Sequence, residues 1–438
     1  MFSRRNRRPT SPELAAAREC LDRGDVPGAL RELRQVSSAP LGEVADVVGR
    51  AAGAAGFDDL RKAATALAAH PDRARQLYDY GYACVERGVS YLAIPALREA
   101  LRLAPGSAGL LRELASAYED EGRHRDAVDA LLAHEDGLAD WPDRYLLVFN
   151  AVLAGDLELA RRQHACLPAP ADDTWLGARE RQNRVLERSS VVGRVSPLDH
   201  SDLRGWQYVM GGTVLGTLSP FGFDAGMAGR YAYLQDSHEL CLHGLLRLKS
   251  VVAAAGVRPR SVSLLPDRGS RILGLAAAEV LGLPAEPFEA GRENTVVIAY
   301  DLDETARADG GPEAIGQLFE RAPGQILHEH ASCWTDPPAV TADSVTLLHQ
   351  SAVAPWGAGL RQGADGEVER GEPDRRPEAA VAAEIVGADP APEAGDGETP
   401  ADPAEKLTDF VSAVAGTWLR GDRARLRSSG PVTSSRFL

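Results

Sequence analysis

Residues 77–105 read LYDYGYACVERGVSYLAIPALREALRLAP, and this stretch decides how the N-terminal part of the chain folds. Its small and large residues fall where the two antiparallel helices of a repeat unit of about 34 residues would touch. These positions are Gly81, Ala93, Leu97, Ala100 and Pro105. The pattern predicts a helical hairpin that belongs to an array of similar units.

Glycines recur on both sides of this stretch at intervals of 32, 32, 34 and 33 residues: Gly24, Gly56, Gly88, Gly122 and Gly155. Four of them are followed five residues later by an alanine: Ala29, Ala93, Ala127 and Ala160. Glycine permits a positive φ in a tight turn, and alanine lets the second helix approach the first. The spacing predicts five hairpins between residues 11 and 170; a non-repeating bundle with evenly spaced turns is the alternative.

The pattern resembles the tetratricopeptide repeat, best over residues 74–107 and next over 108–141. Both units carry the small residue at the eighth position (Gly81, Ala115) and the alanine that opens the second helix (Ala93, Ala127). The resemblance covers roughly a third of the chain. It implies a curved superhelix whose inner groove is lined by the first helix of each unit and binds a partner peptide or helix.

Helical position assigns eight side chains to this inner face. They are Arg75, Asp79, Tyr82, Arg112, Ser116, Glu119, Tyr145 and Asn150. For any single charged residue among them, a solvated helix face is the alternative interpretation.

Residues 176–360 change to alternating strands and helices. Strands are expected at 261–266, 295–300 and 325–330, with helices at 238–255, 271–281 and 312–321 between and around them. This order predicts an α/β domain with a mainly parallel sheet. Ligands of such sheets bind at the carboxyl ends of the strands.

Two of these strand ends carry polar loops. Asp267, Arg268, Gly269 and Ser270 open a helix, and Asp301 and Asp303 follow the next long strand. The layout resembles a type I phosphoribosyltransferase, which implies a phosphate site at the first loop and a ribose site, with a possible Mg²⁺, at the second. The loop after Asp301 lacks the Thr-Thr-Gly of that family, so we expect a non-catalytic domain; an enzyme of glycosyl transfer is the alternative.

Charge and cysteine content exclude several other classes. The net charge of −15 argues against an extended nucleic-acid surface. Five scattered cysteines form no Cys-x-x-Cys pair, and His328 and His330 have no known ligand spacing, so no metal site is expected. No stretch has the length and hydrophobicity of a membrane span or a signal segment, and we expect a cytoplasmic protein without a resident cofactor.

Residues 362–403 hold 12 acidic residues, three arginines and six prolines, which predicts a disordered acidic linker. Beyond it, residues 405–420 place Leu407, Phe410, Val411, Val414 and Trp418 on one face of an amphipathic helix, followed by a basic tail to residue 438. The helix could bind a separate partner or an acidic membrane surface. Docking within the chain, into the repeat groove, is preferred because the tether keeps its local concentration high.

These features leave two hypotheses. The first is an adaptor or scaffold whose repeat groove binds a partner and couples it to a non-catalytic α/β domain. The second is a phosphoribosyltransferase-like enzyme, or a sensor of a nucleotide or of phosphoribosyl pyrophosphate.

Overall fold

The computed structural model describes residues 11–362, 368–391, 393–426, 428 and 430–432. The chain divides into two compact units, Met1–Leu176 and Gly177–Leu438, and we describe each by itself. The first is helical and the second contains a parallel sheet, which confirms the expected combination of a helical repeat and an α/β arrangement. Among the described residues, no helix has the length and apolar content needed to cross a membrane.

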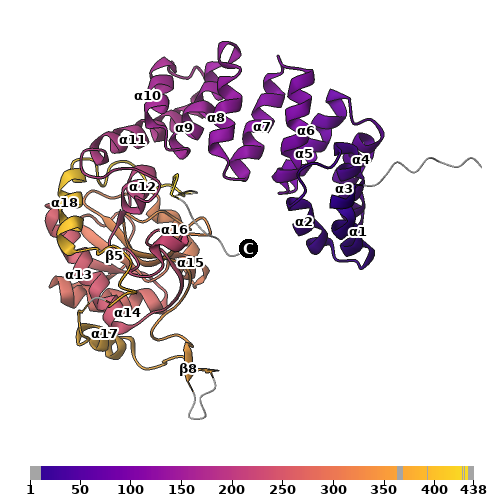
Figure 1. The fold of residues 1–438 in the computed structure, drawn as a ribbon. Helices are drawn as coiled ribbons and strands as arrows, with labels where there is room; N and C mark the ends of the chain where they lie inside the picture. Colours follow the sequence, from indigo (N-terminus) through magenta and orange to yellow (C-terminus); the bar gives the residue numbers. More distant parts are fainter. Residues whose placement is uncertain (1–10, 363–367, 392, 427, 429, 433–438) are drawn as a thin grey trace, which may run out of the picture. The chain divides into compact units, whose positions relative to one another are not determined.

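The first unit is a row of antiparallel helical hairpins (Figure 1). The five pairs are α1 (Ala15–Asp22) with α2 (Val26–Arg34), α3 (Leu41–Ala55) with α4 (Asp58–Ala69), α5 (Ala74–Glu86) with α6 (Ser90–Leu103), α7 (Ala108–Asp120) with α8 (His124–Leu132), and α9 (Tyr145–Leu153) with α10 (Leu157–Cys166). Each hairpin turns at one of the five regularly spaced glycines, whose φ angles lie between 65° and 79°. The regular spacing of these glycines therefore reflects a turn conformation that recurs in each hairpin and that glycine adopts without strain.

Small residues set how closely the helices of a hairpin approach. A Cβ atom placed on Gly81 in α5 would lie 2.5 Å from Cγ of Leu97 in α6, which is closer than two carbon atoms can come. The alanine that follows four of the five turns, such as Ala93 in α6 or Ala127 in α8, is completely buried. These contacts give each hairpin its apolar seam.

The second unit is built on a seven-stranded sheet in which the paired strands are all parallel. Its strand order is β1-β7-β6-β5-β3-β4, with β2 pairing further along the same edge of β7. The strands are β1 (Val214–Leu215), β2 (Tyr231–Gln235), β3 (Ser261–Leu264), β4 (Ala285–Pro287), β5 (Thr295–Ala299), β6 (Ile326–Cys333) and β7 (Ser344–Val353). The sequence predicted β3, β5 and β6, whereas β7 was missed. A separate antiparallel pair joins β8 (Leu360–Gln362) to β9 (Val368–Arg370).

Helices cover both faces of this sheet. α13 (His238–Ala254) packs on β6 and β7, and α14 (Arg268–Leu281) packs beside it on β3 and β5. The step from β5 to β6 runs opposite to the step from β3 to β4, so the right-handed rule for such crossovers assigns α15 (Leu302–Arg307) and α16 (Gly311–Leu318) to the opposite face. α11 (Leu176–Val192) and α12 (Leu203–Gly211) precede the sheet, and α12 contacts β1.

The predicted disordered linker is corrected by the structure. Residues 378–386 form α17 (Glu378–Val386), which packs on α14 and α13 and buries Val381 and Ile385 completely. Asp402 accepts hydrogen bonds from Arg204 at 2.8 and 2.9 Å and from Arg247 at 2.6 Å. The prediction was based on the average composition of the segment. That average does not reveal a short apolar helix or a single carboxylate, both of which pack against the folded unit. Residues 363–367 and 392 of this segment lie outside the described residues.

The amphipathic helix of the tail docks within its own unit, and the preferred docking into the repeat groove is thereby corrected. α18 (Ala404–Val414) packs against α13, with Leu407, Val411 and Val414 fully buried. The ring of Phe410 meets that of Tyr208 edge to face at 5.8 Å. The helix ends at Val414, earlier than residue 420, and its apolar face covers the apolar side of α13.

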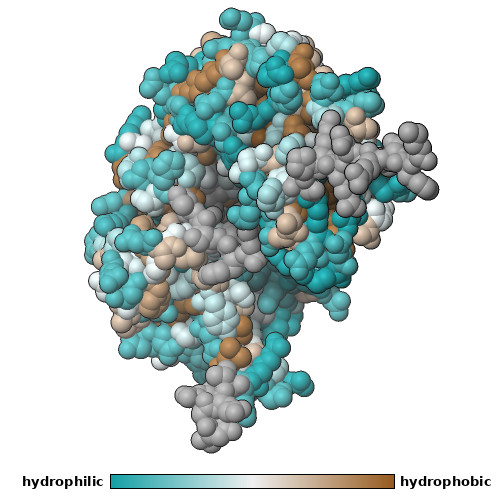
Figure 2. All heavy atoms as spheres, turned by 45° about the vertical axis from the view of Figure 1, so that its right-hand side comes forward, coloured by the Kyte–Doolittle hydropathy of each residue, from teal (hydrophilic) through white to brown (hydrophobic). Residues whose placement is uncertain are grey.

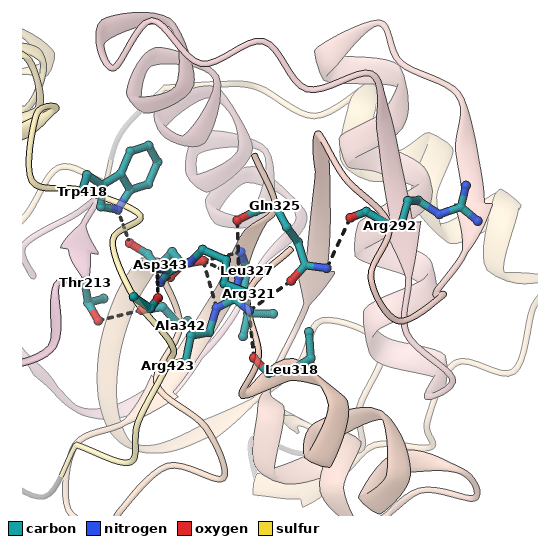
Figure 3. A network of polar contacts seen from close by, with 11 residues as sticks. Thr213, Arg292, Leu318, Arg321, Gln325, Leu327, Ala342, Asp343, Trp418 and Arg423 are labelled. Atoms are coloured by element: carbon teal, nitrogen blue, oxygen red, sulfur yellow. Dashed lines mark hydrogen bonds and ion pairs between the residues drawn. The ribbon is translucent and has the colours of Figure 1, made fainter. Parts of the chain in front are cut away.

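The basic run after this helix contributes a buried anchor, which Figure 3 shows. The guanidinium of Arg423 donates to Asp343 Oδ2 at 2.7 and 3.0 Å and to the Leu318 carbonyl at 2.8 Å. Trp418 Nε1 donates to the Asp343 carbonyl at 3.0 Å. Arg423 therefore fixes the tail to the amino ends of β6 and β7 and presents no charge to a membrane. Arg427 and residues 433–438 lie outside the described residues.

Candidate functional site

Three of the eight predicted partner-binding residues lie together on α5. Arg75 donates to Asp79 at 2.9 Å, and the side chain of Tyr82 is 44% exposed. The ring of Tyr82 lies 6.2 Å from that of Tyr78, which forms an accessible aromatic pair. The molecular face in Figure 2 is mainly hydrophilic, with hydrophobic residues in small groups between hydrophilic ones. A mixed aromatic and charged surface of this kind suits a partner of similar character.

The surface of α5 continues onto α7, because these two helices are in contact. Arg112 donates to the buried carboxylate of Asp143 at 2.6 Å, and Ser116 is half-buried on the same helix. Burial, and then the negative charge of Glu86, raise the pKa of Glu113. Glu113 was missed by the sequence analysis, since nothing in helical spacing shows that two carboxylates from different hairpins lie close together. We call Tyr78, Tyr82, Glu86 and Glu113 the α5–α7 surface.

The other predicted groove residues serve the interior of the array. Asn150 is completely buried; its Nδ2 donates to Glu119 at 2.5 Å and its Oδ1 lies 3.0 Å from Nδ1 of His124. Tyr145 packs its ring between Trp141 and Trp175, with both centroid distances at 5.6 Å. Asn150 and Glu119 are thus structural contacts between α7 and α9.

The predicted phosphate and ribose loops meet at the carboxyl edge of the sheet. The chain leaves β3 for β4 in one direction and β5 for β6 in the other, so the switch point of this doubly wound sheet lies between β3 and β5. Asp267 caps α14 by accepting from the Ser270 amide at 2.8 Å, and its other oxygen accepts from Thr305 Oγ1 at 2.7 Å. The Ser270 hydroxyl is fully buried and accepts from the Tyr300 amide at 3.1 Å. The polar atoms that could bind a phosphate are engaged with one another.

The remaining members of this predicted site also have partners within the protein. Asp301 Oδ1 caps α15 by accepting from the Asp303 and Glu304 amides at 2.8 and 3.2 Å, and burial raises the pKa of Asp301. Asp303 accepts from the Ala339 amide at 3.0 Å, and Arg268 donates to the carbonyls of residues 374 and 376. Gly269 lies close to Tyr300. A phosphoribosyl ligand and its Mg²⁺ stay a prediction.

A cavity of about 280 Å³ lies beside β6 and β7, under the loop that joins them. Glu329 is completely buried in its wall and accepts from the Leu302 amide at 2.8 Å. Burial, and then the charge of Asp301, raise the pKa of Glu329 well above its usual range. Arg230, which lies 5.0 Å from the ring of Trp334, and Gln207 also line the cavity. The lining combines hydrogen-bond donors with the carbonyl oxygen of Gln207.

Four buried polar side chains come together near the carboxyl ends of the strands. Asp236 follows β2, Cys241 lies in the first turns of α13, Tyr300 follows β5, and His330 lies in β6. Asp236 Oδ2 is 2.9 Å from Tyr300 Oη, 3.0 Å from His330 Nε2 and 3.5 Å from Cys241 Sγ. Burial, and then Asp236, raise the pKa of the Cys241 thiol well above its usual range.

Little in the sequence indicates this cluster. The sequence pattern pairs His330 with His328, but the two histidines have different partners. His328 hydrogen-bonds to Ser344 and Thr346 and is not part of the cluster. Asp236 and Cys241 are five residues apart across a strand-to-helix turn, and the histidine comes almost a hundred residues later. Such a group becomes visible only after the strands are paired.

Comparison with known proteins identifies no family for the chain. No protein-family model matches it, and no curated protein matches it either. Several solved structures of MamA align with a part of the chain. MamA AMB-1 has 21% identity and a TM-score of 0.24 over 35% of this chain and 96% of its own; MamA MSR-1 has 21% and 0.23 over 40% and 94%. MamA from Desulfovibrio magneticus RS-1 has 20% and 0.23 over 36% and 94%. At these low scores the repeat assignment stands on the hairpins themselves.

Proposed function

We propose that the protein is an adaptor whose helical array binds a segment of a partner protein, and whose α/β unit is a non-catalytic module. The observation that carries this proposal is the α5–α7 surface. It places an accessible aromatic pair beside two carboxylates on the first helices of consecutive hairpins. In stacked hairpins these helices line the surface that binds other proteins.

The charges on this surface indicate the chemistry of the partner segment. Arg75 and Arg112 are already paired with Asp79 and Asp143. Glu86 and Glu113, by contrast, form no ion pair within the described part of the chain, and their mutual repulsion contributes to the raised pKa of Glu113. A Lys or Arg on the partner would relieve this repulsion. The proposed ligand is therefore a peptide or helix that carries an aromatic or large aliphatic side chain next to a basic residue.

The contacts that Asp267 and Ser270 make within the protein at the switch point support a non-catalytic α/β unit. Among the described residues there, Asp267 and Ser270 are held by hydrogen bonds to the protein itself. The N-terminus of α14 already has a carboxylate cap, which occupies the amide that an incoming phosphate would need. An enzyme would have to break these contacts to bind its substrate.

A selection of displayed peptides against the immobilised full chain tests the adaptor proposal. Enriched peptides should share an aromatic or large aliphatic residue near a Lys or Arg. Tyr82→Ala should weaken the binding of such a peptide about tenfold or more, because truncation removes an exposed aromatic anchor. Glu113→Gln should weaken basic peptides selectively and flatten the salt dependence of their binding.

Glu99→Gln provides the matched control, since Glu99 pairs with Arg102 on the second helix α6, away from the proposed surface. It should leave peptide affinity unchanged. Equal affinity for wild type, Tyr82→Ala and Glu113→Gln, or enrichment of peptides without a basic residue, would contradict the proposal.

The cavity beside Glu329 favours a second candidate function, the sensing of a small polar ligand. Its volume of about 280 Å³ is near the lower end of the range for small-molecule sites, about 300 Å³ upward. Phosphoribosyl pyrophosphate with Mg²⁺, or a nucleotide, should raise the melting temperature if this function holds. If none of these ligands changes the melting temperature, the sensing function is contradicted and the adaptor function is the one that stands.

A further inference from the structure

We propose that Asp236, Cys241 and His330 bind a divalent transition-metal ion, with zinc as the reference metal, in a closed site that holds β2, α13 and β6 together. Three different ligand types, a carboxylate oxygen, a thiol sulfur and an imidazole nitrogen, lie within 4.8 Å of one another. Asp236 directly follows β2, Cys241 lies in α13 and His330 lies in β6, and each is buried. The site is independent of the α5–α7 surface and of the adaptor function.

The separations between the three atoms match the edges of a tetrahedral zinc site. Zinc bonds of about 2.0 Å to nitrogen and oxygen and about 2.3 Å to sulfur imply edges of about 3.3 Å between N and O and about 3.5 Å from S to either. The distances here are 3.0 Å from His330 Nε2 to Asp236 Oδ2, 3.5 Å from Cys241 Sγ to Asp236 Oδ2, and 3.8 Å from Cys241 Sγ to His330 Nε2. The three atoms form one face of a tetrahedron and need to move by only a few tenths of an ångström.

The phenol of Tyr300 lies next to this face. Its oxygen is 2.9 Å from Asp236 Oδ2, and its ring stacks on that of His330 with a centroid distance of 5.5 Å. The fourth position of the metal would thus be taken by the Tyr300 oxygen or by a water held against it. The ring of Trp356 packs on Tyr300 at 4.9 Å and closes the outer side.

Charge balance gives a physical reason for a cation here. The Asp236 carboxylate is buried, and its hydrogen-bond partners among the described residues are the Ser237 amide, Tyr300, His330 and Cys241, with no Arg or Lys. Three of these partners crowd onto the single oxygen Oδ2. A divalent ion that displaces the thiol proton would neutralise both the carboxylate and the resulting thiolate.

The burial of all three ligands makes a structural role the expected one. A catalytic metal keeps a position open to substrate, whereas here the ligands are closed off by α13 on one side and by Tyr300 on the other. A Cβ placed on Gly244 of α13 would lie 2.9 Å from His330 Nδ1, which shows how tightly the helix covers this histidine. The ion would enter as the unit folds and would leave only when it opens.

Metal-loaded refolding of the full chain tests the site. The protein is unfolded with a chelator present, refolded with Co²⁺ or Zn²⁺, and desalted. One equivalent of metal should stay bound, and the cobalt form should show a thiolate-to-cobalt charge-transfer band with the intense visible bands of tetrahedral coordination. Zinc should raise the melting temperature of the chelator-treated protein by about 5 °C or more.

Variants assign the spectrum to these residues. Cys241→Ala should remove the charge-transfer band, and His330→Gln should lower the retained metal several-fold. Cys84→Ala, which removes another fully buried thiol in the first unit, should keep both signals. The wild-type cobalt spectrum keeps the test valid if a cluster variant fails to fold. Wild-type protein that retains far less than one equivalent, or a cobalt band that survives Cys241→Ala, would overturn the proposal in favour of a hydrogen-bonded core without metal.

Discussion

At the scale of single residues, the packing of the array depends on a glycine at a helix crossing. Gly81 lies where α5 crosses α6, and its missing Cβ provides the space that Leu97 fills. A Cβ atom placed on Gly109 in α7, by contrast, would have open space around it. The packing therefore requires glycine at position 81 and leaves room for a larger residue at position 109.

Gly81→Ala should destabilise the protein by about 1–3 kcal/mol, because Leu97 must leave its position to accommodate the added methyl group. Gly109→Ala is the matched control; it should stabilise by about 0.5–1 kcal/mol, since alanine restricts the unfolded chain and favours a helix. Urea-induced unfolding followed by circular dichroism measures both. Changes of the same sign in the two variants would contradict the packing explanation.

The raised pKa of Glu329 predicts a dependence of stability on pH. Its pKa in the folded protein is raised well above the ordinary value of 4.5, by burial first and then by Asp301. A group with a raised folded-state pKa contributes its full stability below the unfolded value and loses it as the pH rises toward the folded value. Glu329→Gln imitates the protonated form, so its free energy of unfolding should exceed that of wild type more at pH 8 than at pH 5.

The expected gain at pH 8 is about 1 kcal/mol or more, because each unit of pKa shift corresponds to about 1.4 kcal/mol. The measurement is urea-induced unfolding of both proteins across this pH range. Parallel curves for wild type and Glu329→Gln would show that Glu329 does not hold its proton in the folded state.

The sequence predicts single residues well where the backbone conformation is repeated. The five turn glycines were identified from their interval, and all adopt positive φ. Asn150 was predicted on the correct helix but with the wrong exposure, since its side chain turns inward to Glu119 and His124. Helical periodicity gives a direction around one helix and contains no information about the neighbour that buries it.

At the scale of elements, α17 and β7 were the least predictable. α17 is short, and its stability comes from Val381 and Ile385 packing on α14, which local propensity does not reveal. β7 contains polar residues that are buried, such as Thr346 and His349, so it lacks the continuous apolar run that marks a buried parallel strand in a sequence. Both elements depend on distant parts of the chain.

Asp402 fastens the segment that leads into α18. Its carboxylate lies between Arg204 and Arg247, and all three side chains are no more than 10% exposed. Asp402→Ala should destabilise by about 3–5 kcal/mol, because it leaves two buried cations without their anion. Hydrogen exchange should also quicken in residues 404–414.

Asp409→Ala provides the comparison, since Asp409 is exposed on the outer side of the same helix. It should change stability by less than about 0.5 kcal/mol and leave hydrogen exchange in α18 unaltered. If Asp402→Ala behaves in the same way, the ion pairs with Arg204 and Arg247 do not hold α18 in place.

At the scale of the whole molecule, the sequence distinguished a repeat from an α/β arrangement because the two use different periods. The interval of 32 to 34 residues between glycines marks one, and alternation of apolar strands with helices marks the other. The candidate sites could not be read in the same way. The α5–α7 surface needs two hairpins to be stacked, and the Asp236–Cys241–His330 cluster needs three strands and a helix to be in place.

Each unit has its own hydrophobic core, so we expect two steps of thermal unfolding. Gly81→Ala should lower the transition temperature of the helical array alone, and Asp402→Ala that of the α/β unit alone. Because the two sites belong to different compact units, the double variant should show the sum of both effects within about 0.5 kcal/mol. Differential scanning calorimetry measures this. A single transition that moves with either substitution would mean that the units unfold together, and binding energy gained at the α5–α7 surface would then stabilise the α/β unit as well.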